Sequence, residues 1–80
     1  MGELVAIGVD THRDTHVAVA LDEVGGLLDS FTVAADAYGY AGLWQWAQGL
    51  GEPVFAVEGT GSYGAGLTAF LAAAGCQVFE

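Results

Sequence analysis

Residues 4–21 read LVAIGVDTHRDTHVAVAL, in which two apolar runs flank a short polar segment. The first run, Leu4–Val9, is nearly continuous and rich in β-branched residues, so it predicts a strand that is buried on both faces and ends at Asp10. The second run, Val17–Leu21, predicts another strand. Because only the polar residues 10–16 separate the two runs, we expect a β-hairpin.

A third strand and a helix follow this hairpin. Asp22–Gly26 joins two acids to two glycines and predicts a turn before a strand over Leu27–Val33, which completes an antiparallel meander. Asp36 is a suitable N-cap for a helix over residues 36–48. The apolar residues of this helix have the spacing of one helical face, i, i+3, i+4 and i+7: Tyr40, Leu43, Trp44 and Ala47.

The rest of the chain predicts two more strands around a second helix. Val54–Val57 is a continuous apolar run that ends at Glu58, and the glycine-rich loop GTGSYGAG over residues 59–66 follows it. Ser62 is a candidate N-cap for the second helix, and Gly75 ends that helix before a strand over 77–79. The predicted apolar face of this helix consists of Leu67, Phe70, Leu71 and Ala74.

The predicted order of elements is therefore β-β-β-α-β-α-β, an α/β fold. A three-strand meander followed by parallel strands with helical crossovers is the ribonuclease H-like arrangement with a mixed sheet. In that arrangement the first and fourth strands lie side by side and run parallel.

Composition restricts the possible classes of protein. With ten Asp and Glu residues against one Lys or Arg, the 80-residue chain has a formal charge of −9, and 54% of its residues are hydrophobic. This excludes a basic nucleic-acid-binding arm and a disordered tail. The first residues lack the basic segment of a signal or transit peptide, the longest apolar run is too short to span a bilayer, and the single Cys76 suits a reducing compartment. We therefore expect a cytoplasmic protein without membrane contact, and the small size predicts that residues 1–80 are one partial domain of a longer chain.

Two carboxylates are candidate metal ligands. In the predicted topology Asp10 and Glu58 follow neighbouring parallel strands, whose carboxyl ends form the ligand-binding edge of open α/β sheets. Adjacent carboxylates repel one another unless a cation lies between them, and oxygen ligands favour Mg²⁺ or Mn²⁺. Such a site would suit cleavage of a phosphodiester. The alternative is that Asp10 starts a turn and Glu58 stabilises the N-terminus of the second helix.

Three motifs together resemble the N-terminal domain of the DEDD transposases of insertion-sequence family one-ten, relatives of the Piv-type invertases. The motifs are GVD ending at Asp10 with His12-Arg13-Asp14 after it, the aromatic segment AYGYAGLWQWA, and VEGTGSYG containing Glu58. This resemblance covers essentially the whole chain.

The resemblance implies a RuvC-like nuclease fold with four metal-binding acids, a guide or bridge RNA, and DNA strand exchange during transposition. It identifies Asp10 as the first acid and Glu58 as the second. The third and fourth acids and a nucleophilic serine would lie beyond Glu80, so this segment alone is not expected to catalyse transposition. The resemblance is also the basis for expecting DNA, RNA and further copies of the protein as partners.

Other interpretations of the same residues remain open. Gly59, Gly61 and Gly64 fit a GxGxxG dinucleotide-binding motif, with Glu80 about 20 residues further on as the ribose-binding acid. The sugar-kinase and actin-like ATPases share the fold but need a glycine-rich first hairpin, which THRDTH is not. The chain is alternatively an inactive truncated remnant.

The alternation of His12, Asp14 and His16 suggests a transition-metal site beside Asp10 if the segment is extended, or the polarity of a turn if it is not.

Overall fold

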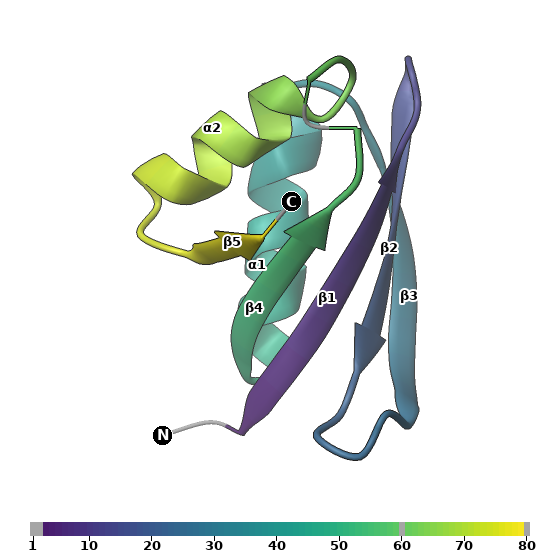
Figure 1. Ribbon diagram of the computed structural model, residues 1–80, viewed down its shortest axis with the longest axis vertical. Coiled ribbons are helices and arrows are strands. Elements are labelled where there is room, and N and C mark those ends of the chain that lie inside the picture. The colour runs from purple at the N-terminus through teal and green to yellow at the C-terminus, as the bar shows by residue number, and fades with distance from the viewer. Residues whose placement is uncertain (1–2, 60, 80) are drawn as a thin grey trace.

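The computed structural model describes residues 3–59 and 61–79, which form one sheet with two helices (Figure 1). The α/β class predicted from the sequence is confirmed. In chain order the elements are β1 (Leu4–Thr11), β2 (Thr15–Leu21), β3 (Leu27–Ala34), α1 (Ala37–Leu50), β4 (Glu52–Val57), α2 (Ala65–Ala73) and β5 (Gln77–Phe79). Within this described part of the chain, neither helix is long and apolar enough to cross a membrane.

The sheet is mixed, with the strand order β3-β2-β1-β4-β5. The first three strands are antiparallel neighbours, and β1 pairs with β4 in parallel, as the sequence predicts. β5 adds to the other edge of β4, also in parallel. The pairing of β1 with β4 makes neighbours of two segments that the meander and α1 separate along the chain.

The first helix begins as the sequence predicts, and the second does not. Asp36 is the N-cap of α1, because its Oδ1 accepts a hydrogen bond from the backbone N–H of Gly39 at 2.8 Å. The predicted Ser62 cap is wrong: α2 starts only at Ala65, after Gly64, and no side chain caps it. The cause is a turn in the preceding loop, where the N–H of Gly64 donates to the carbonyl oxygen of Gly59 at 2.7 Å and delays the helix.

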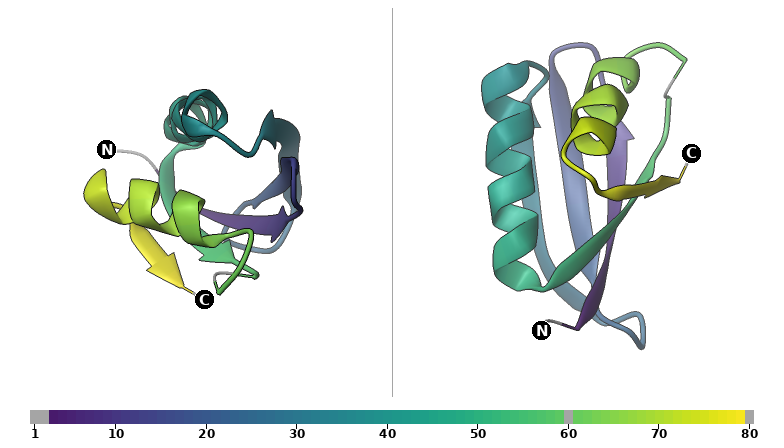
Figure 2. Two further views of the ribbon diagram at one scale, coloured as in Figure 1. Left: turned by 90° about the horizontal axis from the view of Figure 1, so that it is seen from above. Right: turned by 90° about the vertical axis from the view of Figure 1, so that its left-hand side faces the viewer.

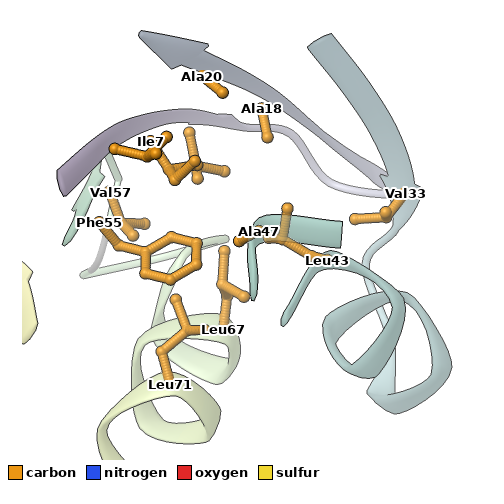
Figure 3. Packing of buried hydrophobic residues seen from close by; sticks show 12 residues of the cluster. Ile7, Ala18, Ala20, Val33, Leu43, Ala47, Phe55, Val57, Leu67 and Leu71 are labelled. Atoms are coloured by element: carbon orange, nitrogen blue, oxygen red, sulfur yellow. The ribbon is translucent and has the colours of Figure 1, made fainter. Parts of the chain in front are cut away.

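Both helices cover the same face of the sheet (Figure 2). The α1 crossover from β3 to β4 and the α2 crossover from β4 to β5 move in the same direction across the sheet, so right-handed connections put both helices on one side. The core between this face and the helices (Figure 3) consists of Val5, Ile7, Val9, Ala18, Ala20, Val33, Leu43, Ala47, Phe55, Val57, Leu67 and Leu71.

The opposite face of the sheet, which we call the open face, is exposed along β1. The prediction that the first strand is buried on both sides is therefore wrong. Along β1 the burial alternates: Val5, Ile7 and Val9 are at most 2% exposed, whereas Leu4, on the other side, is 53% exposed. Within residues 3–59 and 61–79 no helix lies over the open face. A continuous apolar run therefore occurs here in a strand whose outer residues face solvent.

Candidate metal centre

Asp10 and Glu58 lie at the same edge of the sheet, at the ends of neighbouring strands. Asp10 is the penultimate residue of β1, and Glu58 directly follows β4. The backbone N–H of Glu58 donates to the carbonyl oxygen of Val9 at 3.1 Å, so the contact between the strands extends to the site. Because Gly8 is opposite Ala56, the two acids, each two residues further along, belong to the open face.

The two acids line one open hollow of ≈500 Å³. Its floor includes Gly8 and Ala56, whose small size leaves space beside the carboxylates. Both acidic residues are exposed, so solvent and solutes reach them directly. Carboxylate oxygens in an open position are suitable ligands for a hard divalent cation, and they are two of the several oxygens that such an ion takes.

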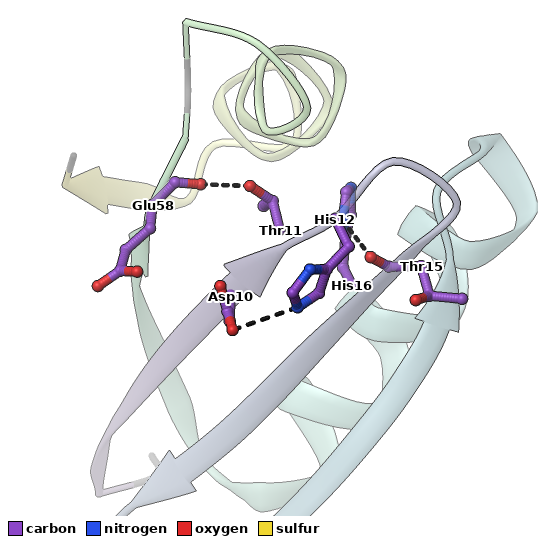
Figure 4. Close-up of polar contacts among 6 residues, drawn as sticks. All are labelled: Asp10, Thr11, His12, Thr15, His16 and Glu58. Atoms are coloured by element: carbon purple, nitrogen blue, oxygen red, sulfur yellow. Dashed lines mark hydrogen bonds and ion pairs between the residues drawn. The ribbon is translucent and has the colours of Figure 1, made fainter.

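Thr11 fixes the backbone around these acids (Figure 4). Its hydroxyl donates to the carbonyl oxygen of Glu58 at 2.6 Å and so joins the ends of β1 and β4. Gly59, the residue after Glu58, has a φ of 72°, and a Cβ at this position would lie 2.6 Å from the Thr11 hydroxyl oxygen. We call the hydrogen bond from the Thr11 hydroxyl to the Glu58 carbonyl oxygen the Thr11–Glu58 bridge. Sequence reasoning missed it; the only available signal was a hydroxyl residue directly after a candidate ligand.

His12 contacts one of the candidate ligands. Its Nε2 lies 3.3 Å from Oδ2 of Asp10, and the side chains are 57% and 63% exposed. An ion pair between such exposed groups contributes little to stability, because water and salt screen it. A cation that binds Asp10 therefore competes with a weak contact.

The histidines and acid of the hairpin do not form a transition-metal site. Thr11 pairs with His16, which is fully buried on the helix-covered face, opposite to the face of Asp10. The His16 ring stacks on Tyr40, with ring centroids 5.9 Å apart. In the described part of the chain, no three His, Cys, Asp or Glu side chains come together as a group that could hold a metal. Only residues 12–14 form the turn between β1 and β2, because His16 lies within β2.

Backbone conformation and close packing explain why glycine occurs at two positions of the 59–66 loop, without reference to a cofactor. Gly59 has its positive φ, and a Cβ on Gly64 would lie 2.9 Å from the carbonyl oxygen of Glu58. A Cβ on Gly61 would meet no atom within 4 Å. Glu80, which the dinucleotide interpretation requires, lies outside the described residues. Two of the three glycines therefore serve the tight connection from β4 to α2.

Comparison with known families places the chain in a transposase family. A family model described as a transposase, that of the DEDD transposases of IS110 (insertion-sequence family one-ten), matches residues 7–80. The match covers nearly the whole chain and includes both acids at the sheet edge. No curated protein matches the chain.

Proposed function

Because the chain belongs to the IS110 family of DEDD transposases, we propose that residues 1–80 form part of a ribonuclease H-like catalytic domain, in which Asp10 and Glu58 bind Mg²⁺ or Mn²⁺ for the cleavage and transfer of DNA strands. The observation that carries this proposal is the parallel pairing of β1 with β4. It brings together two acids that are 48 positions apart in the sequence, on one face and around one hollow. The mixed five-stranded sheet with two helices is consistent with such a domain.

Each residue of the site has a distinct role in this proposal. Asp10 and Glu58 would hold the cation from the ends of two neighbouring strands, and the Thr11–Glu58 bridge joins those ends. The chemistry that a divalent ion supplies in such a site is Lewis-acid stabilisation of the oxygens of a phosphodiester. The contact of His12 with Asp10 is weak and exposed, so it would leave that carboxylate available to a cation.

The composition limits what these residues do alone. A segment with a formal charge of −9 repels the phosphates of DNA and of a guide RNA, so the basic surface for both would have to come from outside residues 1–80 or from a partner. Two carboxylates alone bind a divalent cation weakly, because affinity grows with the number and charge of the ligands. The remaining acids and the serine expected for the family complete the site.

The first experiment measures cation binding to this chain directly. Mn²⁺ is titrated into the ¹⁵N-labelled chain, and paramagnetic broadening of its amide NMR signals is followed. We expect broadening centred on Gly8, Asp10 and Glu58, because these residues line the hollow that would hold the ion. Excess Mg²⁺ should reverse the broadening by competition.

Glu58→Gln and Glu52→Gln form a matched pair of variants. Both remove one exposed carboxylate next to or within β4, but Glu52 lies at the opposite end of that strand. Glu58→Gln should abolish the local broadening and Glu52→Gln should preserve it. Equal broadening in both variants would refute the site. In a full-length family member with these residues, Asp10→Asn or Glu58→Gln should abolish Mg²⁺-dependent DNA cleavage without unfolding the protein.

A further inference from the structure

β3 is an edge strand of the sheet (Figure 1), and only β2 pairs with it among the strands that residues 3–59 and 61–79 form. Along a strand, successive residues direct their backbone N–H and C=O groups alternately to one side and to the other. In an edge strand, the groups on the outer side have no ladder partner and can pair with a strand of another molecule. We call the outer side of β3 the β3 edge.

The hydrogen bonds to β2 show which residues point to the β3 edge. The backbone N–H of Ala35, directly after β3, donates to the carbonyl oxygen of Asp14 at 2.9 Å. The pairing with β2 is regular back to Asp29, so every second residue counted back from Ala35 also points to β2. The residues between them direct their N–H and C=O groups outward, namely Ser30, Thr32 and Ala34.

The carboxylate of Asp29 occupies one of these outward groups. Asp29 is opposite the fully buried Ala20, so its side chain leaves β3 on the helix-covered side of the sheet. Its Oδ1 accepts a hydrogen bond from the backbone N–H of Ser30 at 2.8 Å. A hydrogen bond to an ionised acceptor is stronger than one to a neutral carbonyl oxygen. The Ser30 N–H is therefore already bound within the chain and is not free to join another strand.

Trp46 of α1 holds the second oxygen of the same carboxylate. Its indole N–H donates to Oδ2 of Asp29 at 2.9 Å, and its ring stacks on Phe31 with ring centroids 5.4 Å apart. The hydrogen bond from Trp46 and then that from Ser30 lower the pKa of Asp29, so this carboxyl stays ionised at neutral pH and continues to accept both. We call these two hydrogen bonds to Asp29 the Asp29 clamp.

The β3 edge is otherwise suited to pairing with the β3 of a second copy. In an antiparallel pair with a two-fold axis through Thr32, the N–H of Ser30 in each copy would donate to the carbonyl oxygen of Ala34 in the other. Phe31 of each copy would lie opposite Val33 of the other, and no two acids would be directly opposite. The same outward groups on both copies are thus complementary to one another. This pairing requires a free Ser30 N–H.

β3 carries no other residue type that commonly protects an edge strand. Its sequence LLDSFTVA contains neither Lys nor Pro, and Asp29 is its only charged residue. A charged side chain turned in over the edge is one of the devices that keep edge strands apart. The formal charge of −9 also makes two copies repel one another, but salt screens that repulsion. The protection that acts at the β3 edge itself is therefore the Asp29 clamp.

We propose that the Asp29 clamp keeps the β3 edge unpaired, and that without the clamp the β3 strands of two copies join across this edge. This inference goes beyond the proposed function and does not depend on it, because Asp10 and Glu58 lie at the ends of β1 and β4. With the clamp in place, contacts between copies of the chain would have to use another surface.

The test compares the self-association of Asp29→Ala and Glu23→Ala. Both substitutions remove one exposed carboxylate, but Glu23 lies in the turn before β3 and not at its edge. Association is measured by sedimentation equilibrium with EDTA, which keeps cations from bridging copies, and with about 0.15 M salt, where the Debye length is about 8 Å. We expect Asp29→Ala to raise the association constant at least about tenfold over the unaltered chain. Glu23→Ala should leave the constant within about twofold, because its charge effect is screened.

Two further variants locate the contact between copies. Thr32→Pro removes an outward N–H and leaves the ladder to β2 intact, because Pro is tolerated in an edge strand where the lost N–H faces solvent. The double variant Asp29→Ala/Thr32→Pro should therefore return to the association constant of the unaltered chain. Trp46→Phe removes one of the two hydrogen bonds of the clamp but keeps the charge of Asp29, so it should give an intermediate constant. This variant keeps the proposal testable if Asp29→Ala fails to fold.

Amide hydrogen exchange reports on the same contact residue by residue. The N–H of Thr32 points outward, so its exchange should be fast in the unaltered chain at every protein concentration. In Asp29→Ala, this exchange should slow as the protein concentration rises, because the N–H joins the strand of a second copy.

Several outcomes would overturn the proposal. An unchanged association constant in folded Asp29→Ala would show that the clamp does not protect the edge. An equal rise in Glu23→Ala would mean that net charge alone limits association. Association of Asp29→Ala that Thr32→Pro does not remove would place the contact elsewhere, and slow exchange of Thr32 that depends on concentration in the unaltered chain would show that the edge pairs despite the clamp.

Discussion

Truncation of Phe55 tests the one-sided core. Phe55 is fully buried among Leu67, Leu71 and Trp44, whose ring centroid lies 6.4 Å from its own. Phe→Ala changes at such sites cost about 3–5 kcal/mol, because apolar contacts are lost and a cavity remains. A chain of this length has a total stability of roughly 4–12 kcal/mol. Phe55→Ala should therefore remove a large part of the free energy of unfolding. If this free energy falls by about 1 kcal/mol per M of urea, the substitution should lower the urea midpoint by about 3 M or unfold the chain.

Phe79→Ala is the matched control for this truncation. Phe79 pairs with Ala56 on the open face and is 53% exposed, so the same chemical change should lower the free energy of unfolding by only about 1 kcal/mol or less. Both variants are measured by urea unfolding with circular dichroism. If Phe79→Ala lowers the free energy of unfolding as much as Phe55→Ala does, the assignment of the two faces of the sheet is wrong.

Two further predictions concern single contacts. The indole N–H of Trp46 donates to Oδ2 of Asp29 at 2.9 Å, and this hydrogen bond is the main cause of the lowered pKa of that carboxyl. The hydrogen bond therefore stabilises the folded chain fully at pH values above the ordinary pKa of Asp. This stabilisation is lost as the pH falls through the lowered pKa of Asp29. Trp46→Phe should raise the pKa of Asp29 towards its ordinary value in an NMR titration, and an unchanged value would contradict this. Gly59→Ala should lower the free energy of unfolding measured in urea by about 1–2 kcal/mol, because Gly59 has a positive φ and an added Cβ would meet the Thr11 hydroxyl oxygen. Gly61→Ala should leave the free energy of unfolding unchanged, because a Cβ there meets no atom within 4 Å. Equal effects of the two substitutions would be inconsistent with the Thr11–Glu58 bridge.

The order of helices and strands was accessible from the sequence because each element carries a local signal. Asp36 caps α1 as its position indicates, and the helical spacing of Leu43 and Ala47 correctly identifies buried residues. The burial of the first strand was not accessible in the same way. An apolar run such as Leu4–Val9 has the same pattern whether one or both faces are covered, and which of these holds depends on the crossovers elsewhere in the chain.

The site was predictable in part. The parallel pairing that brings Asp10 and Glu58 to one edge followed from the order of elements, but the position of His16 did not follow from alternation across the turn. A signal for it existed within its own strand, because His16 alternates with Ala18 and Ala20, which are both fully buried. Trp46 lies about 200° around α1 from Trp44 and is half-buried, because β3 brings Phe31 and Asp29 alongside it.

The parallel pairing of β1 with β4 also has a kinetic consequence. Each of the two carboxylates belongs to a separate stretch of chain, and contacts between residues far apart in sequence are slow to form because a long loop must first close. A partly folded chain that holds only the β1–β2–β3 meander contains Asp10 without Glu58 beside it. On the proposed metal assignment, cation binding is thus coupled to completion of the fold, and nascent or proteolysed fragments of the chain lack the paired ligands.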